Sequence, residues 1–197
     1  MGTYKFTRLT LLLALILWLV SACGGYTFHG QAYDPAQPAP AIEGVNWDGT
    51  TFQLSQQKGK VVILFFGYSY CPDTCPLTMA QLAQTYRQLG EKAKNLAVVF
   101  VSTDPDRDTP ARLAEYIPAF DRSFYGIHLT PEQLTTVKQA YGVFAEPSAT
   151  PDATAGYEIV HSSYLFVLDQ TGNLRLLFPS DVPQADLIAD LEQLMKS

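Results

Sequence analysis

The amino-acid sequence predicts an α/β sandwich, with a central mixed sheet flanked by helices and with a β-hairpin and a helix at its C-terminal end. Uninterrupted apolar runs, typical of strands buried on both faces, occur at 61–66 and 96–101. Segments with apolar residues at helical spacing alternate with these runs. The 197 residues, 47% hydrophobic and 16% charged, suffice for one globular domain and exclude a disordered or fibrous protein.

The first predicted strand, 61–66, ends at Gly67. A helix is expected over 74–88, because apolar residues recur at largely helical spacing and Pro76 suits a first helical turn, where its missing N–H is not required. The second buried strand follows at 96–101. This first half therefore has the order strand, helix, strand.

Two further helices are expected at 111–116 and 131–141, each opened by a threonine and a proline. The chain then changes pattern, because strands at 164–168 and 174–178 flank a turn-rich connector and so predict an antiparallel hairpin. A last helix carries Leu187, Ile188, Leu191 and Leu194. This order of elements is that of a thioredoxin-like fold, although it also fits other α/β sandwiches.

The N-terminus predicts export from the cytoplasm. Lys5 and Arg8 precede an apolar run of about a dozen residues, which is too short to span a bilayer comfortably. Small residues follow it and lead to Cys23, a pattern that resembles the lipobox of bacterial lipoproteins. Residues 1–22 are therefore expected to be a lipoprotein signal peptide, with Cys23 lipidated. An uncleaved short anchor, or a signal peptide cut elsewhere, would place the domain in the same compartment.

Residues 23–45 are rich in glycine and proline and show little hydrophobic periodicity, so we expect a lipidated flexible tether there and the folded domain at 46–197. The chain has 13 basic and 19 acidic residues and a net charge of −6. Removal of 1–22 deletes two of the basic residues and leaves 13 − 2 = 11, so the mature charge is −8. This balance excludes nucleic acid as an expected partner and favours attachment to the membrane by lipid.

The chemistry is expected in the segment 67–76, which leaves a buried strand and enters a helix. Both remaining cysteines, Cys71 and Cys75, lie in it. Unpaired N–H groups at a helix start favour the thiolate, which is both the metal ligand and the nucleophile. A structural disulfide closing so short a loop would contribute little stability. Inert buried thiols fit the flanking proline, aspartate and tyrosine residues poorly. The site is therefore expected to be redox-active, metal-binding or both.

Three blocks of the sequence resemble the Sco/SenC family: 65–76 (FFGYSYCPDTCP), 102–110 (STDPDRDTP) and 161–164 (HSSY). Their order and spacing match, and the resemblance covers about 42–195. It implies a thioredoxin-like fold in which Cys71, Cys75 and His161 bind copper. Two soft thiolates select Cu(I), and an added imidazole also accommodates Cu(II). Zinc usually takes four ligands, and no fourth cysteine or partner histidine is evident nearby in the sequence.

Four other residues bear on this interpretation. Asp104 follows the second buried strand, and the family has an acid in this block, so it is assigned a secondary role in orienting His161 or a loop. The alternative is that Asp104, like Asp108, only forms turns and caps. His29 lies in the expected tether and His128 before a helix cap, without comparable support as ligands. Tyr70 replaces a histidine that is frequent in the family, a difference that concerns the tuning of the site.

The resemblance implies a membrane-tethered copper-binding factor for the assembly of the copper A centre of cytochrome c oxidase, not an enzyme with turnover. Its expected partners are the copper A-bearing subunit and other periplasmic copper chaperones or thioredoxin-like reductants. Its expected place is the bacterial cell envelope, with the domain on the extracytoplasmic side. The alternative is a thiol–disulfide oxidoreductase that uses Cys71 and Cys75, although such pairs usually have two intervening residues and this one has three. A copper sensor or a metal-free binding lipoprotein remains open.

Overall fold

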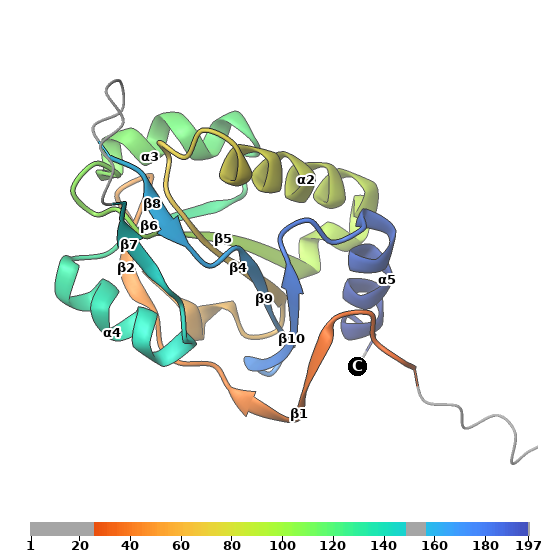
Figure 1. Cartoon of the computed structure of the whole chain (residues 1–197). Coiled ribbons are helices and arrows are strands. Elements are labelled where there is room, and N and C mark those ends of the chain that lie inside the picture. The colour runs from red at the N-terminus through yellow and green to blue at the C-terminus, as the bar shows by residue number, and fades with distance from the viewer. Residues whose placement is uncertain (1–25, 149–156, 197) are drawn as a thin grey trace, which may run out of the picture.

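The computed structural model describes residues 26–148 and 157–196. The signal peptide expected at 1–22 and the lipidation expected at Cys23 lie outside these residues. An eight-stranded mixed sheet forms the centre of the domain (Figure 1), in the order β1-β10-β9-β4-β5-β6-β2-β3. Its strands are β1 (Gln31–Pro38), β2 (Glu43–Asn46), β3 (Thr51–Gln53), β4 (Val61–Gly67), β5 (Leu96–Ser102), β6 (Tyr125–His128), β9 (Tyr164–Leu168) and β10 (Asn173–Pro179).

The α-helices are α2 (Thr74–Leu89), α3 (Pro110–Tyr116), α4 (Pro131–Tyr141) and α5 (Gln184–Leu194), and the short 3₁₀ helices are η1 (Leu54–Gln57), η2 (Gly90–Asn95) and η3 (Ile117–Ala119). Two more strands, β7 (Ala145–Pro147) and β8 (Ile159–His161), pair only with each other among the described residues. The predicted α/β sandwich with a C-terminal hairpin and helix is therefore confirmed.

The two apolar runs form the middle of the sheet. Strands β4 and β5 pair in parallel along seven residues, and all fourteen of these residues are buried. On one face of the sheet, Phe100 of β5 packs against Tyr116 of α3. On the other face, the ring of Phe66 in β4 packs against Tyr141 of α4. Helices on both faces explain why these strands are apolar without alternation.

The expected tether is wrong from residue 26 onward. Strand β1 pairs antiparallel with β10, and β2 pairs with both β3 and β6. The chain before β1 is held by Asp190 of α5, whose carboxylate has no exposed surface and accepts bonds from the N–H groups of His29 and Gly30 and from the hydroxyl of Tyr26. Prolines are tolerated at the ends and bulges of an edge strand such as β1. Because prolines usually indicate a loop, this strand could not be recognised from the sequence.

The starts of the helices follow the sequence. Thr109 caps α3 and Thr130 caps α4, each with its side chain accepting a backbone N–H and with a proline in the first turn. In the part of the chain that the structure describes, no helix has both the length and the apolar character needed to cross a membrane.

Candidate metal and thiol centre

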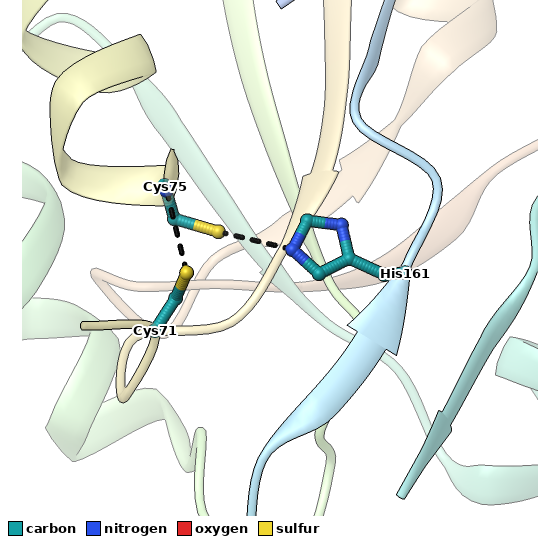
Figure 2. A group of neighbouring side chains, drawn as sticks. All are labelled: Cys71, Cys75 and His161. Carbon is teal, nitrogen blue, oxygen red and sulfur yellow. Dashed lines mark hydrogen bonds between the residues drawn. The ribbon is translucent and has the colours of Figure 1, made fainter. Parts of the chain in front are cut away.

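Two cysteines and a histidine from distant parts of the chain meet at one edge of the main sheet (Figure 2). Cys71 lies in the loop after β4, Cys75 in the first turn of α2 and His161 at the end of β8. The Sγ of Cys75 lies 3.5 Å from Nε2 of His161, and the Sγ of Cys71 lies 3.4 Å from the backbone N of Cys75. One donor atom of each residue lies within 4.8 Å of the others. The structure thus brings together all three residues that the sequence singled out as ligands.

Gly67, the last residue of β4, makes room for the inner sulfur. A Cβ at this position would lie 2.8 Å from the Sγ of Cys75 and 3.0 Å from the Phe100 ring. The absence of a side chain therefore lets Cys75 pack against the end of the strand, where it has no exposed surface. Cys71 is partly exposed. The two cysteines therefore differ in exposure to solvent, and Cys71 is the more exposed of the two.

The two cysteines also differ in charge. A hydrogen bond from Cys75 lowers the pKa of Cys71 to about 3, with help from His161 and from backbone N–H groups at the start of α2, although burial opposes the shift. The same hydrogen bond and burial raise the pKa of Cys75. The pair therefore holds one proton, with Cys71 the thiolate and Cys75 the thiol that donates to it.

His161 presents Nε2 to the sulfurs because its other nitrogen is used elsewhere. Its Nδ1 lies 3.2 Å from the carbonyl oxygen of Ser162. When a metal binds, a proton on Nδ1 would satisfy this carbonyl and leave the Nε2 lone pair for the ion. In the metal-free protein, a proton on Nε2 is the one that lets His161 support the Cys71 thiolate. The ring of Tyr68 meets the imidazole edge to face, with centroids 5.7 Å apart.

Sequence reasoning missed the residue that fixes the cysteine loop. Asp108, expected to act at most in a turn or helix cap, is fully buried, and its carboxylate accepts the backbone N–H and the hydroxyl of Ser69 and the hydroxyl of Ser102. Burial raises the pKa of Asp108. Arg112 also donates to the Ser69 hydroxyl. These bonds attach the loop, two residues before Cys71, to the ends of β5 and α3. A lone Asp before Thr-Pro carries no sequence signal for this role.

Asp104 lies at the same edge of the sheet as the cysteine loop, as expected from the parallel pairing of β4 and β5. Its buried carboxylate bonds Arg107 and the hydroxyl of Tyr157. It therefore contacts a loop residue and not His161 directly. Tyr70 is 43% exposed, and the Arg107 and Arg112 guanidinium groups lie 5.0 and 4.8 Å from its ring centroid.

The other two histidines lie outside this group. The Nδ1 of His128 contacts the carbonyl oxygen of Asp108, and His29 contacts Asp190 and Asp186. Beside His161 an open groove of about 580 Å³ runs past Thr74, Ser162 and Asp181. The imidazole therefore lines a surface that a partner molecule could reach.

The donor set fits copper. Two sulfurs and one imidazole nitrogen suit Cu(I), which prefers soft ligands and low coordination numbers. Within the described residues, no further cysteine, histidine or carboxylate joins the group of three, so the four-ligand shell of a structural zinc site is not assembled there.

Comparison with known proteins agrees with this geometry. A family model described as SCO1/SenC matches residues 32–196. A Stutzerimonas stutzeri protein named for copper binding is 33% identical over 137 residues, which cover 69% of this chain and 66% of that one. The chain thus spans just under two thirds of that relative's length.

Two solved structures of similar proteins extend the comparison. The apo Sco1 protein of Thermus thermophilus is 34% identical, with a TM-score of 0.76 over 87% of this chain and 99% of that one. Bradyrhizobium japonicum ScoI, solved with copper bound, is 28% identical, with a TM-score of 0.73 over 80% of this chain and 99% of that one. Since the family model matches nearly all of the domain, this chain belongs to the SCO1/SenC family.

Proposed function

We propose that this protein binds one copper ion through Cys71, Cys75 and His161 and supplies it during assembly of the copper A centre of cytochrome c oxidase. The observation that carries the proposal is the convergence of three donor atoms within 4.8 Å of one another. Family membership supports it, because similar proteins are named for copper binding or were solved with copper bound.

The donor set accounts for both oxidation states of the cargo. The two thiolates hold Cu(I), and the His161 imidazole adds the nitrogen donor that Cu(II) prefers. The two thiolate charges also balance the charge of Cu(II) and exceed that of Cu(I). Cys71 is already ionised near neutral pH, so only the Cys75 thiol must lose a proton when the metal binds. The groove beside His161 offers a route for transfer to a recipient site.

The proposal extends to the place and the partners of the protein. Lipid on Cys23 would hold the domain at the extracytoplasmic face of the bacterial membrane, as the signal-like N-terminus suggests. The recipient would be the copper A-bearing oxidase subunit, and other periplasmic copper chaperones or thioredoxin-like reductants would load or reduce the site. Mass spectrometry of the N-terminal peptide from untreated bacteria tests the anchor, and globomycin, which blocks the lipoprotein signal peptidase, should leave residues 1–22 attached. A mature N-terminus other than lipidated Cys23 would contradict it.

Anaerobic copper titration of the reduced full chain in detergent tests the site. The expected result is one tight copper per chain, with a thiolate-to-Cu(II) charge-transfer band that Cys71→Ala, Cys75→Ala and His161→Ala each disturb. His29→Asn serves as the control. His29 contacts Asp190 of α5 and lies outside the group of three, so this variant should leave the band unchanged. If the wild-type chain holds no specific copper, the proposed function is wrong.

A second function is favoured by the low pKa of Cys71, which makes it a nucleophile. The Cys71 thiolate would attack a disulfide of a copper-site protein and form a mixed disulfide. Cys75 would then lose its proton and attack the Cys71 sulfur. The target leaves as a dithiol with two electrons gained, and a new Cys71–Cys75 disulfide remains, to be reduced by a thioredoxin-like dithiol.

The two functions respond differently to the loss of the imidazole. His161→Ala removes a copper ligand, whereas a copper-independent reductase keeps both reacting sulfurs. Reduction of a model disulfide peptide by stoichiometric reduced protein should therefore be largely retained in this variant. A strong loss of the reaction in His161→Ala would contradict the copper-independent function.

A further inference from the structure

The main sheet holds the chain only on the C-terminal side of His161, where the carbonyl oxygen of Ser163 accepts the backbone N–H of Ser180 and β9 begins at Tyr164. The strand of His161, β8, pairs only with β7 within the described residues, in a two-stranded sheet separate from the eight-stranded one. The imidazole nevertheless lies against Cys75, which is fixed at the end of β4. On its N-terminal side, the β8 segment must be docked onto the cysteine loop by contacts outside the main sheet.

Tyr157, four residues before His161, makes this contact. Its hydroxyl donates to Oδ1 of Asp104 at 2.7 Å, and its carbonyl oxygen accepts from Nη1 of Arg107 at 2.8 Å. The Arg107 guanidinium also lies 3.6 Å from the centroid of the Tyr157 ring, which is stacking distance. The hydroxyl, the ring and the backbone carbonyl of Tyr157 thus all contact the loop that follows β5.

Asp104, which binds Tyr157, has a fixed orientation of its own. Asp104 is 2% exposed, its backbone N–H bonds the hydroxyl of Ser102, and its carboxylate pairs with Arg107. A buried carboxylate with these bonds has a single favourable orientation. The acceptor offered to Tyr157 is therefore preorganised by β5, the same strand that pairs with β4 below the cysteines.

Tyr68 links Arg107 to the imidazole of His161. The Arg107 guanidinium lies 5.8 Å from the Tyr68 ring centroid, and the Tyr68 ring packs edge to face on His161. The backbone of Ile159, the first residue of β8, also lies close enough to the Tyr68 hydroxyl to oppose the rise in its pKa that burial causes. Tyr157 and Tyr68 together hold the stretch 157–161, which ends at His161, against the cysteine loop.

We propose that Asp104, Arg107 and Tyr157 form a latch that positions the His161 imidazole over the two sulfurs and so determines how strongly the site prefers Cu(II). The latch rests on the proposed copper-binding function. Two thiolates suffice for Cu(I), whereas Cu(II) needs the nitrogen donor in place. A weakened latch should therefore lower the affinity for Cu(II) and leave the affinity for Cu(I) unchanged. The three residues act through His161, so they are positioning residues and not ligands.

The test uses Tyr157→Phe, which removes the hydroxyl and keeps the ring under Arg107, and Asp104→Asn. The matched control is Tyr26→Phe, which removes a bond of equal length, 2.7 Å, between a tyrosine and the Asp190 carboxylate of α5. In both latch variants of the full chain we expect the Cu(II) affinity to fall about 10-fold to 100-fold, as for other outer contacts of metal ligands. The imidazole nitrogen coupling in the Cu(II) EPR spectrum should weaken, while Cu(I) affinity stays within about twofold of the wild-type value and the control retains all three properties.

A metal-free measurement separates this proposal from the proposed function. In the reduced apo protein, the ring resonances of His161 should shift toward those of an exposed histidine in Tyr157→Phe and Asp104→Asn. If wild type binds no copper but these resonances move, the copper function and the Cu(II) preference fail, and only the positioning of His161 by the latch stands. Unmoved resonances, or an equal loss of Cu(I) and Cu(II) affinity, would overturn the latch.

Discussion

The Nε2 atom of His161 lies 3.5 Å from the Sγ of Cys75, although 86 positions separate the two residues in the chain. The histidine comes from a two-stranded sheet and the cysteine from a helix that covers the main sheet. The site therefore exists only when these two parts are docked. Under the proposed function, copper that bridges them would bind the native state more tightly than the unfolded chain and so stabilise the docked arrangement.

Alkylation tests the difference between the two thiols. Because the pKa of Cys71 is lowered to about 3, mainly by the Cys75 hydrogen bond, its thiolate form is already complete at pH 6. Iodoacetamide should therefore modify Cys71 first, at a rate that changes little between pH 6 and pH 8. Mass spectrometry of tryptic peptides from the reduced apo protein at a series of pH values provides the rates.

Cys75→Ala is the informative variant for the same measurement. It removes the hydrogen bond that most strongly favours the Cys71 thiolate, so the midpoint of the alkylation profile should move to higher pH. Modification of Cys75 before Cys71 in the wild-type chain, or a rate that rises tenfold per pH unit up to pH 8, would contradict this assignment.

Gly67→Ala should damage the candidate metal site more than the fold. The new Cβ would lie 2.8 Å from the Sγ of Cys75, so the sulfur must move by about 1 Å to reach an ordinary contact distance. The variant should lose about 1–3 kcal/mol in the free energy of unfolding, as overpacked cores do, and its Cu(II) charge-transfer band should shift or vanish.

Gly30→Ala is the control for that experiment. A Cβ there would lie 2.6 Å from the Phe178 ring, a clash of the same kind in another part of the molecule. Urea denaturation should record a similar loss of stability, whereas the copper spectrum should match that of wild type. Equal spectral damage in the two variants would mean that Gly67 acts only on general stability.

Asp108→Ala should be among the most destabilising single changes at this edge of the sheet. It leaves the N–H and hydroxyl of Ser69 and the hydroxyl of Ser102 without their buried acceptor. At about 1–3 kcal/mol for each unsatisfied group, the expected loss in the free energy of unfolding is about 3 kcal/mol or more. Urea denaturation measures it. Ser69→Ala removes one of these groups together with its need for a partner, and a loss as large as that of Asp108→Ala would contradict the account.

The long elements, and the three residues whose donor atoms meet, could be predicted from the sequence. The physical reasons for these successes also explain what was missed. The apolar runs at 61–66 and 96–101 are buried on both faces, so their pattern is unmistakable. Strands β2, β3, β6, β7 and β8 have three or four residues each, too few for a periodic pattern. The resemblance located His161, but nothing in the sequence indicated that its strand forms a separate sheet.

The N-terminal segment was misjudged for a different reason. Glycine and proline at 23–45 suggest an extended linker. From residue 26 the segment is nevertheless attached to the fold, because the buried carboxylate of Asp190 accepts hydrogen bonds from the Tyr26 hydroxyl and from two backbone N–H groups. Asp190 sits in the middle of an amphipathic helix, where an acidic residue ordinarily faces water. Asp104 and Asp108 are similar cases, since three-dimensional position decides what a buried aspartate binds.

This N-terminal contact predicts a pH dependence of stability. The hydrogen bond to Asp190 is the main cause that raises the pKa of His29 above its ordinary 6.5, although the ring is partly exposed. A histidine whose folded-state pKa is raised contributes stability that is fully present below pH 6.5 and is lost as the pH rises through the raised value. His29→Asn should therefore have a lower Tm than wild type at pH 5.5, and the gap should narrow by pH 8.

Tyr26→Phe separates the titration of His29 from the general effect of the contact. Tyr26 donates to the same carboxylate, but its pKa is raised to about 12, so it does not titrate between pH 5.5 and pH 8. Its loss should lower Tm by a similar amount at both pH values. Thermal unfolding followed by circular dichroism measures both variants. If the gap between His29→Asn and wild type stays constant across this range, then His29 is not the group that couples the N-terminal segment to pH.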